Sequence, residues 1–272
     1  MAIYSGPTQY SIVANIAALT PIKTALRTRM ATATHCKRKN KMRIFVALII
    51  VLHVAACGIT PRQSSGDILV IGDSVLAWNR SGGQDVGRVI AAELGRDVVS
   101  RATLGARVQS GGLGALGGLR IPDQLPLGSW DWVVMNGGAN DLAFTCGCAR
   151  CDAEIDRLIA ANNQTGAIPD LITRARLQGA QVLWAGYYEA PASRSFGACR
   201  PALVELERRI ARYAAATPGV YFVDTEDVLD PAVPSLLAAD RTHPSPAGSA
   251  VIGRFIAQEI SARSGHSALP EG

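Results

Sequence analysis

Residues 67–74 read Asp-Ile-Leu-Val-Ile-Gly-Asp-Ser, and the fold assignment starts from this stretch. Four consecutive apolar residues that end in a glycine turn are typical of a buried strand in a parallel sheet, because helices cover both faces of such a sheet. Similar apolar runs follow at 97–100, 131–136, 180–185 and 220–224. Helical spacing of apolar residues occurs at 84–95, 151–161, 169–178, 200–216 and 245–262. This alternation predicts a three-layer α/β fold, with a parallel sheet of about five strands and helices on both faces.

Charge divides the chain into two parts. The whole sequence has 27 basic and 22 acidic residues and a formal net charge of +5. Residues 1–56 contain 8 of the basic residues and none of the acidic ones, so the rest of the chain has 19 against 22, a net charge of −3. A slightly acidic body lacks the positive surface that phosphate backbones require, and nucleic acid is therefore not an expected partner.

The basic leader has the three parts of a secretory signal peptide. Basic residues dominate 37–43, thirteen largely apolar residues follow, and the segment ends in Val54-Ala55-Ala56-Cys57-Gly58. Thirteen helical residues cover about 20 Å, which is less than the roughly 30 Å hydrocarbon core, so a permanent span is not expected. The ending resembles a bacterial lipoprotein box, in which cleavage leaves Cys57 as the lipid-bearing first residue. The alternative is a secreted protein that is cleaved after Ala56.

The leader and the strand pattern together define four parts of the chain. We expect a leader with signal peptide at 1–56, a polar tether at 57–66, one α/β domain at 67–263 and a flexible tail at 264–272. Met42 or Met30 is an alternative start, because residues 1–41 match no part of a signal peptide.

Four cysteines remain in the domain: Cys146, Cys148, Cys151 and Cys199. Their clustering would suit a zinc site in a cytosolic protein. An even number of cysteines in an exported protein instead favours disulfides, here two. Three pairings remain open, and among them we slightly prefer Cys146–Cys151 with Cys148–Cys199.

Polar residues and glycines gather where the expected strands end. The first strand ends in Gly72-Asp73-Ser74, the second leads to Thr103-Leu104-Gly105, and the third ends in Gly137-Gly138-Ala139-Asn140-Asp141. The last helix is preceded by Asp240-Arg241-Thr242-His243. In parallel sheets functional groups collect outside the carboxyl ends of the strands, so we expect these four segments to meet at one edge.

In order and spacing the four segments resemble the marks of the SGNH hydrolases, also called the GDSL family. The resemblance covers about 67–262 and implies a flavodoxin-like sheet and a Ser-His-Asp triad. It assigns Ser74 as nucleophile, His243 as base and Asp240 as the group that orients the base. It also implies an oxyanion hole made by the backbone N–H groups of Ser74 and Gly105 and the side-chain amide of Asn140.

The residue chemistry supports this assignment independently. Ester hydrolysis needs a nucleophile, a base, a group that orients the base, and donors for the oxyanion. From Cys57 onward the only histidines are His243 and His266, and only His243 has an acid three residues before it. Taken singly, each site residue also has a plain structural interpretation, as a turn residue, a helix cap or a buried core histidine.

These observations predict a serine esterase or acyl hydrolase that acts through an acyl-enzyme. Thioesterase and lysophospholipase activities are compatible with this prediction. Two alternatives remain open: transfer or removal of acetyl groups on envelope polysaccharide by the same triad, and a non-catalytic flavodoxin-like binding module. We expect no cofactor and no metal. We expect a monomer that is lipid-anchored on the periplasmic side of the bacterial cell envelope, or secreted, and that acts on a small acyl ester or an acylated envelope substrate.

Overall fold

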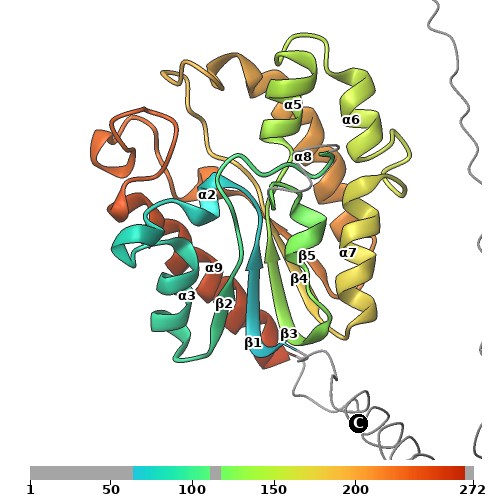
Figure 1. The fold of residues 1–272 in the computed structure, drawn as a ribbon, viewed down its shortest axis with the longest axis vertical. Helices are drawn as coiled ribbons and strands as arrows, with labels where there is room; N and C mark the ends of the chain where they lie inside the picture. Colours follow the sequence, from blue (N-terminus) through green and yellow to red (C-terminus); the bar gives the residue numbers. More distant parts are fainter. Residues whose placement is uncertain (1–63, 111–117, 267–272) are drawn as a thin grey trace, which may run out of the picture. The chain divides into compact units, whose positions relative to one another are not determined.

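A computed structural model of the chain describes residues 64–110 and 118–266, which belong to one compact unit (Figure 1). The expected leader, the lipidation site at Cys57 and most of the tether lie outside the described residues. So do part of the glycine-rich segment, at 111–117, and residues 267–272. Within the described part, no helix is both long enough and apolar enough to span a membrane.

The sheet has five parallel strands in the order β2-β1-β3-β4-β5, which confirms the predicted fold class. The strands are β1 (Ser64–Ile71), β2 (Val98–Ser100), β3 (Gly128–Met135), β4 (Gln181–Ala185) and β5 (Val220–Val223). The order reverses between β1 and β3, and this flavodoxin-like switch point opens a crevice at the carboxyl ends of the strands. Because Ile71 pairs with Met135, the segments that follow β1 and β3 emerge side by side.

Helices cover both faces of the sheet. The α-helices are α2 (Ser74–Ala77), α3 (Val86–Leu94), α5 (Ala139–Cys146), α6 (Asp152–Leu158), α7 (Ala167–Leu177), α8 (Arg200–Ala215) and α9 (Pro246–His266). Short 3-10 helices are η1 (Arg80–Gly82), η2 (Ile121–Gln124), η3 (Gly197–Cys199), η4 (Thr225–Asp227) and η5 (Pro234–Leu236). Helices α3 and α9 pack together on one side of the sheet, and α5 to α8 lie on the other (Figure 1).

The core explains why the apolar runs form strands. Residues 68–71 of β1 are fully buried, as are the large side chains of Trp132 on β3 and Trp184 on β4. Complete burial of one such side chain contributes about 1.5–3 kcal/mol. Buried central strands therefore hold the sheet rigid, and the turns at their carboxyl ends are fixed relative to one another.

The structure differs from the predicted boundaries in three places. Strand β1 begins at Ser64, which pairs with Gly128, so the last three residues of the expected tether belong to the sheet. Helix α9 continues to His266, where the Arg263–Glu259 ion pair and a hydrogen bond from Ser264 Oγ to the Ile260 carbonyl support its last turns. The expected loop that carries Asn140 is instead the first turn of helix α5.

Candidate active site

The nucleophile turn between β1 and α2 depends on a glycine. Gly72 has a φ of +147°, and a Cβ at this position would lie 1.8 Å from Asn136 Oδ1. The Asn136 side chain occupies the position of that Cβ, because its oxygen packs against this turn and accepts a hydrogen bond from the Asp73 N–H (2.9 Å). The Gln124 amide bonds both backbone groups of Gly72, at 2.7 and 3.0 Å. The turn that presents Ser74 is therefore rigid before any substrate binds.

Asp73 caps helix α2 and does not face solvent. Its carboxylate accepts hydrogen bonds from the Val75 N–H (3.0 Å), the Asn136 amide (2.8 Å) and the Tyr187 hydroxyl (2.5 Å). Burial raises the pKa of Asp73, and these hydrogen bonds offset part of that effect. Burial and the neighbouring Asp73 also raise the pKa of Tyr187 well above its ordinary value. Asp73 is thus a structural residue that fixes the start of α2.

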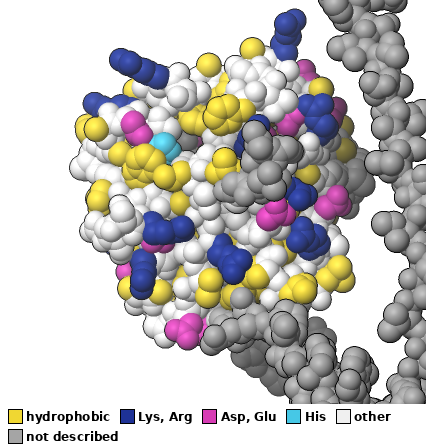
Figure 2. Space-filling model, viewed as in Figure 1, with side chains coloured by type: hydrophobic (Ala, Val, Ile, Leu, Met, Phe, Trp, Pro, Cys, Tyr) yellow, Lys and Arg dark blue, Asp and Glu magenta, His cyan; other side chains and the backbone are white. Residues whose placement is uncertain are grey.

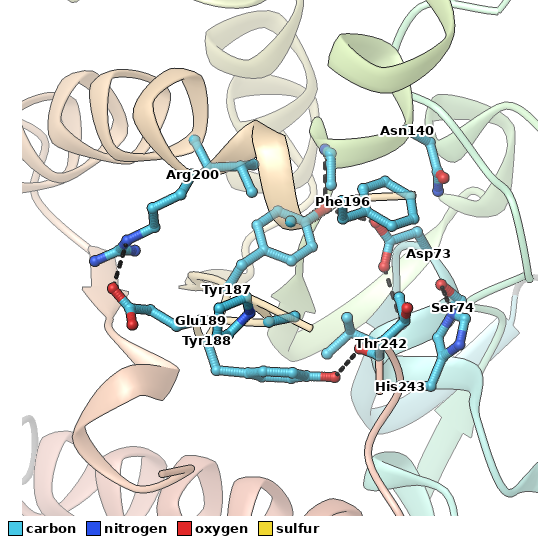
Figure 3. A pocket seen from close by; sticks show the side chains of 16 residues that line it. Asp73, Ser74, Asn140, Tyr187, Tyr188, Glu189, Phe196, Arg200, Thr242 and His243 are labelled. Atoms are coloured by element: carbon cyan, nitrogen blue, oxygen red, sulfur yellow. Dashed lines mark hydrogen bonds and ion pairs between the residues drawn. The ribbon is translucent and has the colours of Figure 1, made fainter. Parts of the chain in front are cut away.

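Ser74, His243 and Asp240 form a continuous chain of hydrogen bonds. His243 Nε2 lies 2.9 Å from Ser74 Oγ (Figure 3). His243 Nδ1 lies 2.6 Å from Asp240 Oδ2. The other carboxylate oxygen of Asp240 accepts the backbone N–H groups of Thr242 (2.9 Å) and His243 (3.0 Å). The structure therefore brings together the three residues that the sequence assigned to a triad, although Ser74 lies 169 positions from His243 in the chain.

The carboxyl group of Asp240 is held in its charged form. Partial burial raises the pKa of Asp240, but the hydrogen bonds from the His243 ring and from the two backbone N–H groups outweigh it, and the net pKa lies below the ordinary value. A carboxylate bonded to one nitrogen of His243 fixes the tautomer that leaves the other nitrogen able to accept a proton from Ser74.

Asn140, one of the predicted oxyanion donors, lines the same cavity as Ser74. Asn140 occupies the first turn of α5, and its Nδ2 donates one hydrogen to the Ala106 carbonyl (3.0 Å), which orients the amide and leaves its second hydrogen for a ligand. Among the described residues the backbone N–H groups of Ser74 and Gly105 have no hydrogen-bond partner. Gly105 has a φ of +72° with no atom within 4 Å of an added Cβ, so the backbone conformation, and not close contact, favours glycine here.

Asp141 holds the segment that contains Gly105. Its carboxylate accepts the backbone N–H groups of Val108 (3.0 Å) and Gln109 (2.7 Å). Burial raises the pKa of Asp141 to about 7, although these two bonds act in the opposite direction. Neighbouring residues of α5 therefore serve the same site, because Asn140 points to the candidate oxyanion hole and Asp141 supports it.

A cavity of about 150 Å³ opens beside the triad (Figure 3). Ser74, Asn140 and His243 lie on one side of it. The opposite wall is mainly apolar and comes from the segment after β4 and from α8: Tyr187, Tyr188, Ala190, Pro191, Phe196 and Leu203. Glu189 and Arg200, which form an ion pair at 2.9 Å, also line the cavity. Figure 2 shows a histidine (cyan) at the surface beside hydrophobic side chains, and the His243 side chain is 16% exposed.

Comparison with known proteins identifies the family. Residues 70–251 match the GDSL-like lipase/acylhydrolase family. The chain belongs to this family. A search of curated proteins found no match.

Similar solved structures have low sequence identity to this chain. A G-D-S-L family protein from Desulfitobacterium hafniense is 14% identical, with a TM-score of 0.50 over 70% of this chain and 97% of that chain. A candidate SGNH hydrolase from Slackia heliotrinireducens is 23% identical, with a TM-score of 0.48 and coverages of 71% and 97%. A GDSL-like lipase from Bacteroides thetaiotaomicron is 19% identical, with a TM-score of 0.49 and coverages of 72% and 88%.

The four cysteines in the domain of this GDSL protein form two disulfides. Cys146 pairs with Cys151 and Cys148 pairs with Cys199, with Cα–Cα distances of 5.3 and 4.6 Å. This is the pairing that the sequence analysis slightly preferred. The second bridge joins Cys148, in the turn just after the Asn140-bearing helix α5, to Cys199, the residue that precedes α8 beside the cavity wall. Within the described residues no group of three or more His, Cys, Asp or Glu side chains is arranged to hold a metal ion.

Sequence analysis missed two aromatic residues of the site. Tyr187 follows β4 and bridges Asp73 to helix α5, because its hydroxyl also accepts the Ala139 N–H (3.2 Å). Trp78 follows α2 and stacks on the ring of His243. The only signal for Tyr187 was its position at the carboxyl end of the fourth strand, and Trp78 lies just four residues after Ser74.

Proposed function

We propose that the chain is a serine esterase that hydrolyses carboxylic esters through an acyl-enzyme. The observation that carries this proposal is the chain of hydrogen bonds from Ser74 Oγ through His243 to Asp240, which lies at the wall of an open cavity. A serine next to an oriented histidine can be deprotonated as it attacks, and this geometry is what acyl transfer requires.

The first half of the reaction acylates the serine. Ser74 Oγ attacks the ester carbonyl carbon while His243 Nε2 takes the hydroxyl proton. The carbonyl oxygen becomes an oxyanion, which the Asn140 amide and the N–H groups of Ser74 and Gly105 stabilise. The C–O bond to the alcohol then breaks, and the alcohol leaves with the proton from His243.

The second half releases the acid by the same groups. Water gives a proton to His243 and attacks the acyl carbonyl, and the bond to Ser74 Oγ breaks as the serine regains a proton. Asp240 remains ionised throughout and stabilises the imidazolium that forms twice in the cycle.

The cavity supports a small apolar acyl or alcohol group as the part of the substrate that binds near Ser74. Its volume of about 150 Å³ is close to that of an engineered apolar cavity that binds benzene, so a group of about six heavy atoms fits it. At its border Glu189 is paired with Arg200, which also binds Glu226. Short acyl esters are therefore the class to test first.

The test is hydrolysis of p-nitrophenyl acetate and of longer acyl homologues by the full chain. Ser74→Ala should lower kcat/KM by roughly 10³-fold or more while the fold stays intact. Ser81→Ala, at an exposed serine on η1, is the matched control and should leave the rate unchanged. A well-folded Ser74→Ala protein with near wild-type turnover would contradict the assignment. Adding an acceptor sugar to the assay measures acetyl transfer in competition with hydrolysis.

We also propose that the enzyme is exported and anchored to the cell envelope by a lipid on Cys57. The support is the sequence pattern at 37–58 and the two disulfides, which form readily in an oxidising compartment. Cys57→Ser should release the protein from the envelope fraction or block its processing. Unchanged partitioning into membranes would contradict the anchor.

A further inference from the structure

The ring of His243 is covered on one face by Trp78. The two ring centroids are 3.7 Å apart and the planes differ by 4°, so the indole and the imidazole are stacked in parallel. Trp78 is the C-terminal cap of α2, the one-turn helix that Ser74 begins. One short helix therefore carries the candidate nucleophile at its start and, at its end, an aromatic ring that stacks on the candidate base.

Hydrogen bonds alone do not fix the orientation of His243. Its contacts to Asp240 and Ser74 are made by Nδ1 and Nε2, and the lone pair or hydrogen of an imidazole nitrogen points along the plane of the ring. Two such bonds define a line through the ring but allow the ring to swing about that line. The parallel indole restricts this motion, because any tilt of the imidazole would bring the two rings into collision.

The residue after Trp78 ties α2 to the segment that carries the base. Asn79 has a φ of +65°, a conformation that asparagine tolerates better than most residues. Its Nδ2 donates to the Pro244 carbonyl (3.0 Å) and to Ser249 Oγ on α9 (2.9 Å). Trp78 therefore lies between helix α2 and the anchored residue Asn79, and its backbone is fixed on both sides.

The charge on His243 during the reaction gives the stack a second role. Aromatic faces attract cations, and the imidazolium formed when Ser74 attacks is a cation in contact with the indole face. The side chain of Asp240 is 40% exposed, so water screens part of its attraction, whereas the His243 side chain is only 16% exposed. The indole face therefore adds to the stabilisation that the Asp240 carboxylate gives to the charged His243 ring.

Other charged groups near His243 are independent of Trp78. Asp73 interacts with His243 from the start of α2, and Asp240 from the base's own segment. From the segment after β4, Tyr188 donates a hydrogen bond to the Thr242 carbonyl (2.8 Å), and Glu189 is paired with Arg200. A substitution at position 78 leaves all of these groups in place.

We propose that Trp78 is a positioning residue for the base: its indole fixes the plane of the His243 ring and stabilises the protonated form of that ring. The inference rests on the proposed serine esterase function. It assigns to Trp78 an effect on kcat and on the protonation of His243, with no contact to substrate.

The kinetic test compares Trp78→Leu with Trp78→Phe in the full chain. Leucine keeps an apolar cover over His243 and removes the aromatic face, whereas phenylalanine keeps a ring. The acid limb of kcat/KM against pH reports the free-enzyme base. We expect Trp78→Leu to shift this limb down by about 0.5 pH unit and to lower kcat severalfold with little change in KM. Trp78→Phe should keep both the acid limb and kcat close to the wild-type values. Phe144→Leu, at an exposed phenylalanine of α5, should change neither.

A second measurement separates this proposal from the proposed function. The His243 imidazole is titrated by NMR in the Ser74→Ala background, where no turnover is needed, with the signal assigned by its loss in His243→Asn. The same downward shift is expected when Trp78→Leu is added. An unchanged His243 titration together with a lower melting temperature would overturn the proposal and leave Trp78 a packing residue. Activity that survives Ser74→Ala would instead defeat the esterase assignment.

Discussion

At the scale of single residues, Asn140 shows how a side chain can be prepared for a charge that appears only during a reaction. One hydrogen of its amide bonds the Ala106 carbonyl, so the amide is already oriented in the free protein. The side chain is almost fully buried, and its neighbour Asp141 holds the adjoining segment by two backbone bonds. A donor fixed in this way need not reorganise when the oxyanion forms, which is the basis of oxyanion stabilisation.

Asn140→Ala should therefore lower kcat by about 10²-fold and leave KM nearly unchanged, because an oxyanion donor acts mainly in the transition state. Steady-state kinetics with p-nitrophenyl acetate measure both constants. Gln109→Ala, a change on the supporting segment that keeps the backbone N–H bonded to Asp141, is the matched control. An effect confined to KM would make Asn140 a substrate-binding residue.

At the scale of elements, locally encoded features were predictable. Buried strands such as β1 and β4 appear in the sequence as apolar runs, because helices cover both of their faces. The meeting of Ser74, Asp240 and His243 followed from the rule that functional groups gather at the carboxyl ends of parallel strands. Helix α5 was missed, because Gly137 and Gly138 before Asn140 resemble a turn, and here tertiary packing outweighs local propensity.

Contacts between distant segments could not be predicted in the same way. The Tyr187 hydroxyl bonds Asp73 across 114 positions, and Asn79 bonds Pro244 across 165. These contacts depend on which helices pack side by side, and no local pattern encodes that. The disulfide pairing was open for the same reason, since it depends on the end of α5 lying next to the start of α8.

The two disulfides should contribute differently to stability. Cys148–Cys199 closes 51 positions and Cys146–Cys151 closes 5, so the chain-entropy relation gives about 4 and about 2 kcal/mol. The double variant Cys148→Ser/Cys199→Ser should therefore lower the free energy of unfolding more than Cys146→Ser/Cys151→Ser. Urea unfolding of the oxidised proteins measures the difference. Because only the longer bridge joins α5 to α8, its loss should also lower kcat more.

Equal losses in the two double variants would contradict this ranking. Mass spectrometry of the alkylated, unreduced protein checks its premise, since four free thiols in protein from its native compartment would exclude both bridges.

At the scale of the whole molecule, two buried carboxyl groups place a limit on stability at high pH. Burial raises the pKa of Glu207 on α8 to about 8, although the Tyr187 N–H (2.5 Å) bonds its carboxyl group. Burial likewise raises the pKa of Asp141 to about 7. A carboxyl group whose pKa is raised on folding binds its proton more tightly in the folded state. Its stabilising effect is complete below the unfolded pKa and is lost as the pH rises through the folded value.

The free energy of unfolding should therefore fall from about pH 5 to about pH 8, because over this range the unfolded chain has lost these protons while the folded protein still holds them. The opposite effect of Glu205, whose pKa is lowered to about 2 by its hydrogen bonds with Arg208 and Arg209, acts below this window. Glu207→Gln keeps an oxygen to accept the Tyr187 N–H and removes one titration, so its melting temperature should vary less from pH 5 to pH 8. Glu93→Gln, at an exposed glutamate of α3, should follow the wild type. A wild-type melting temperature that rises with pH across this window would show that these two carboxyl groups do not govern stability there.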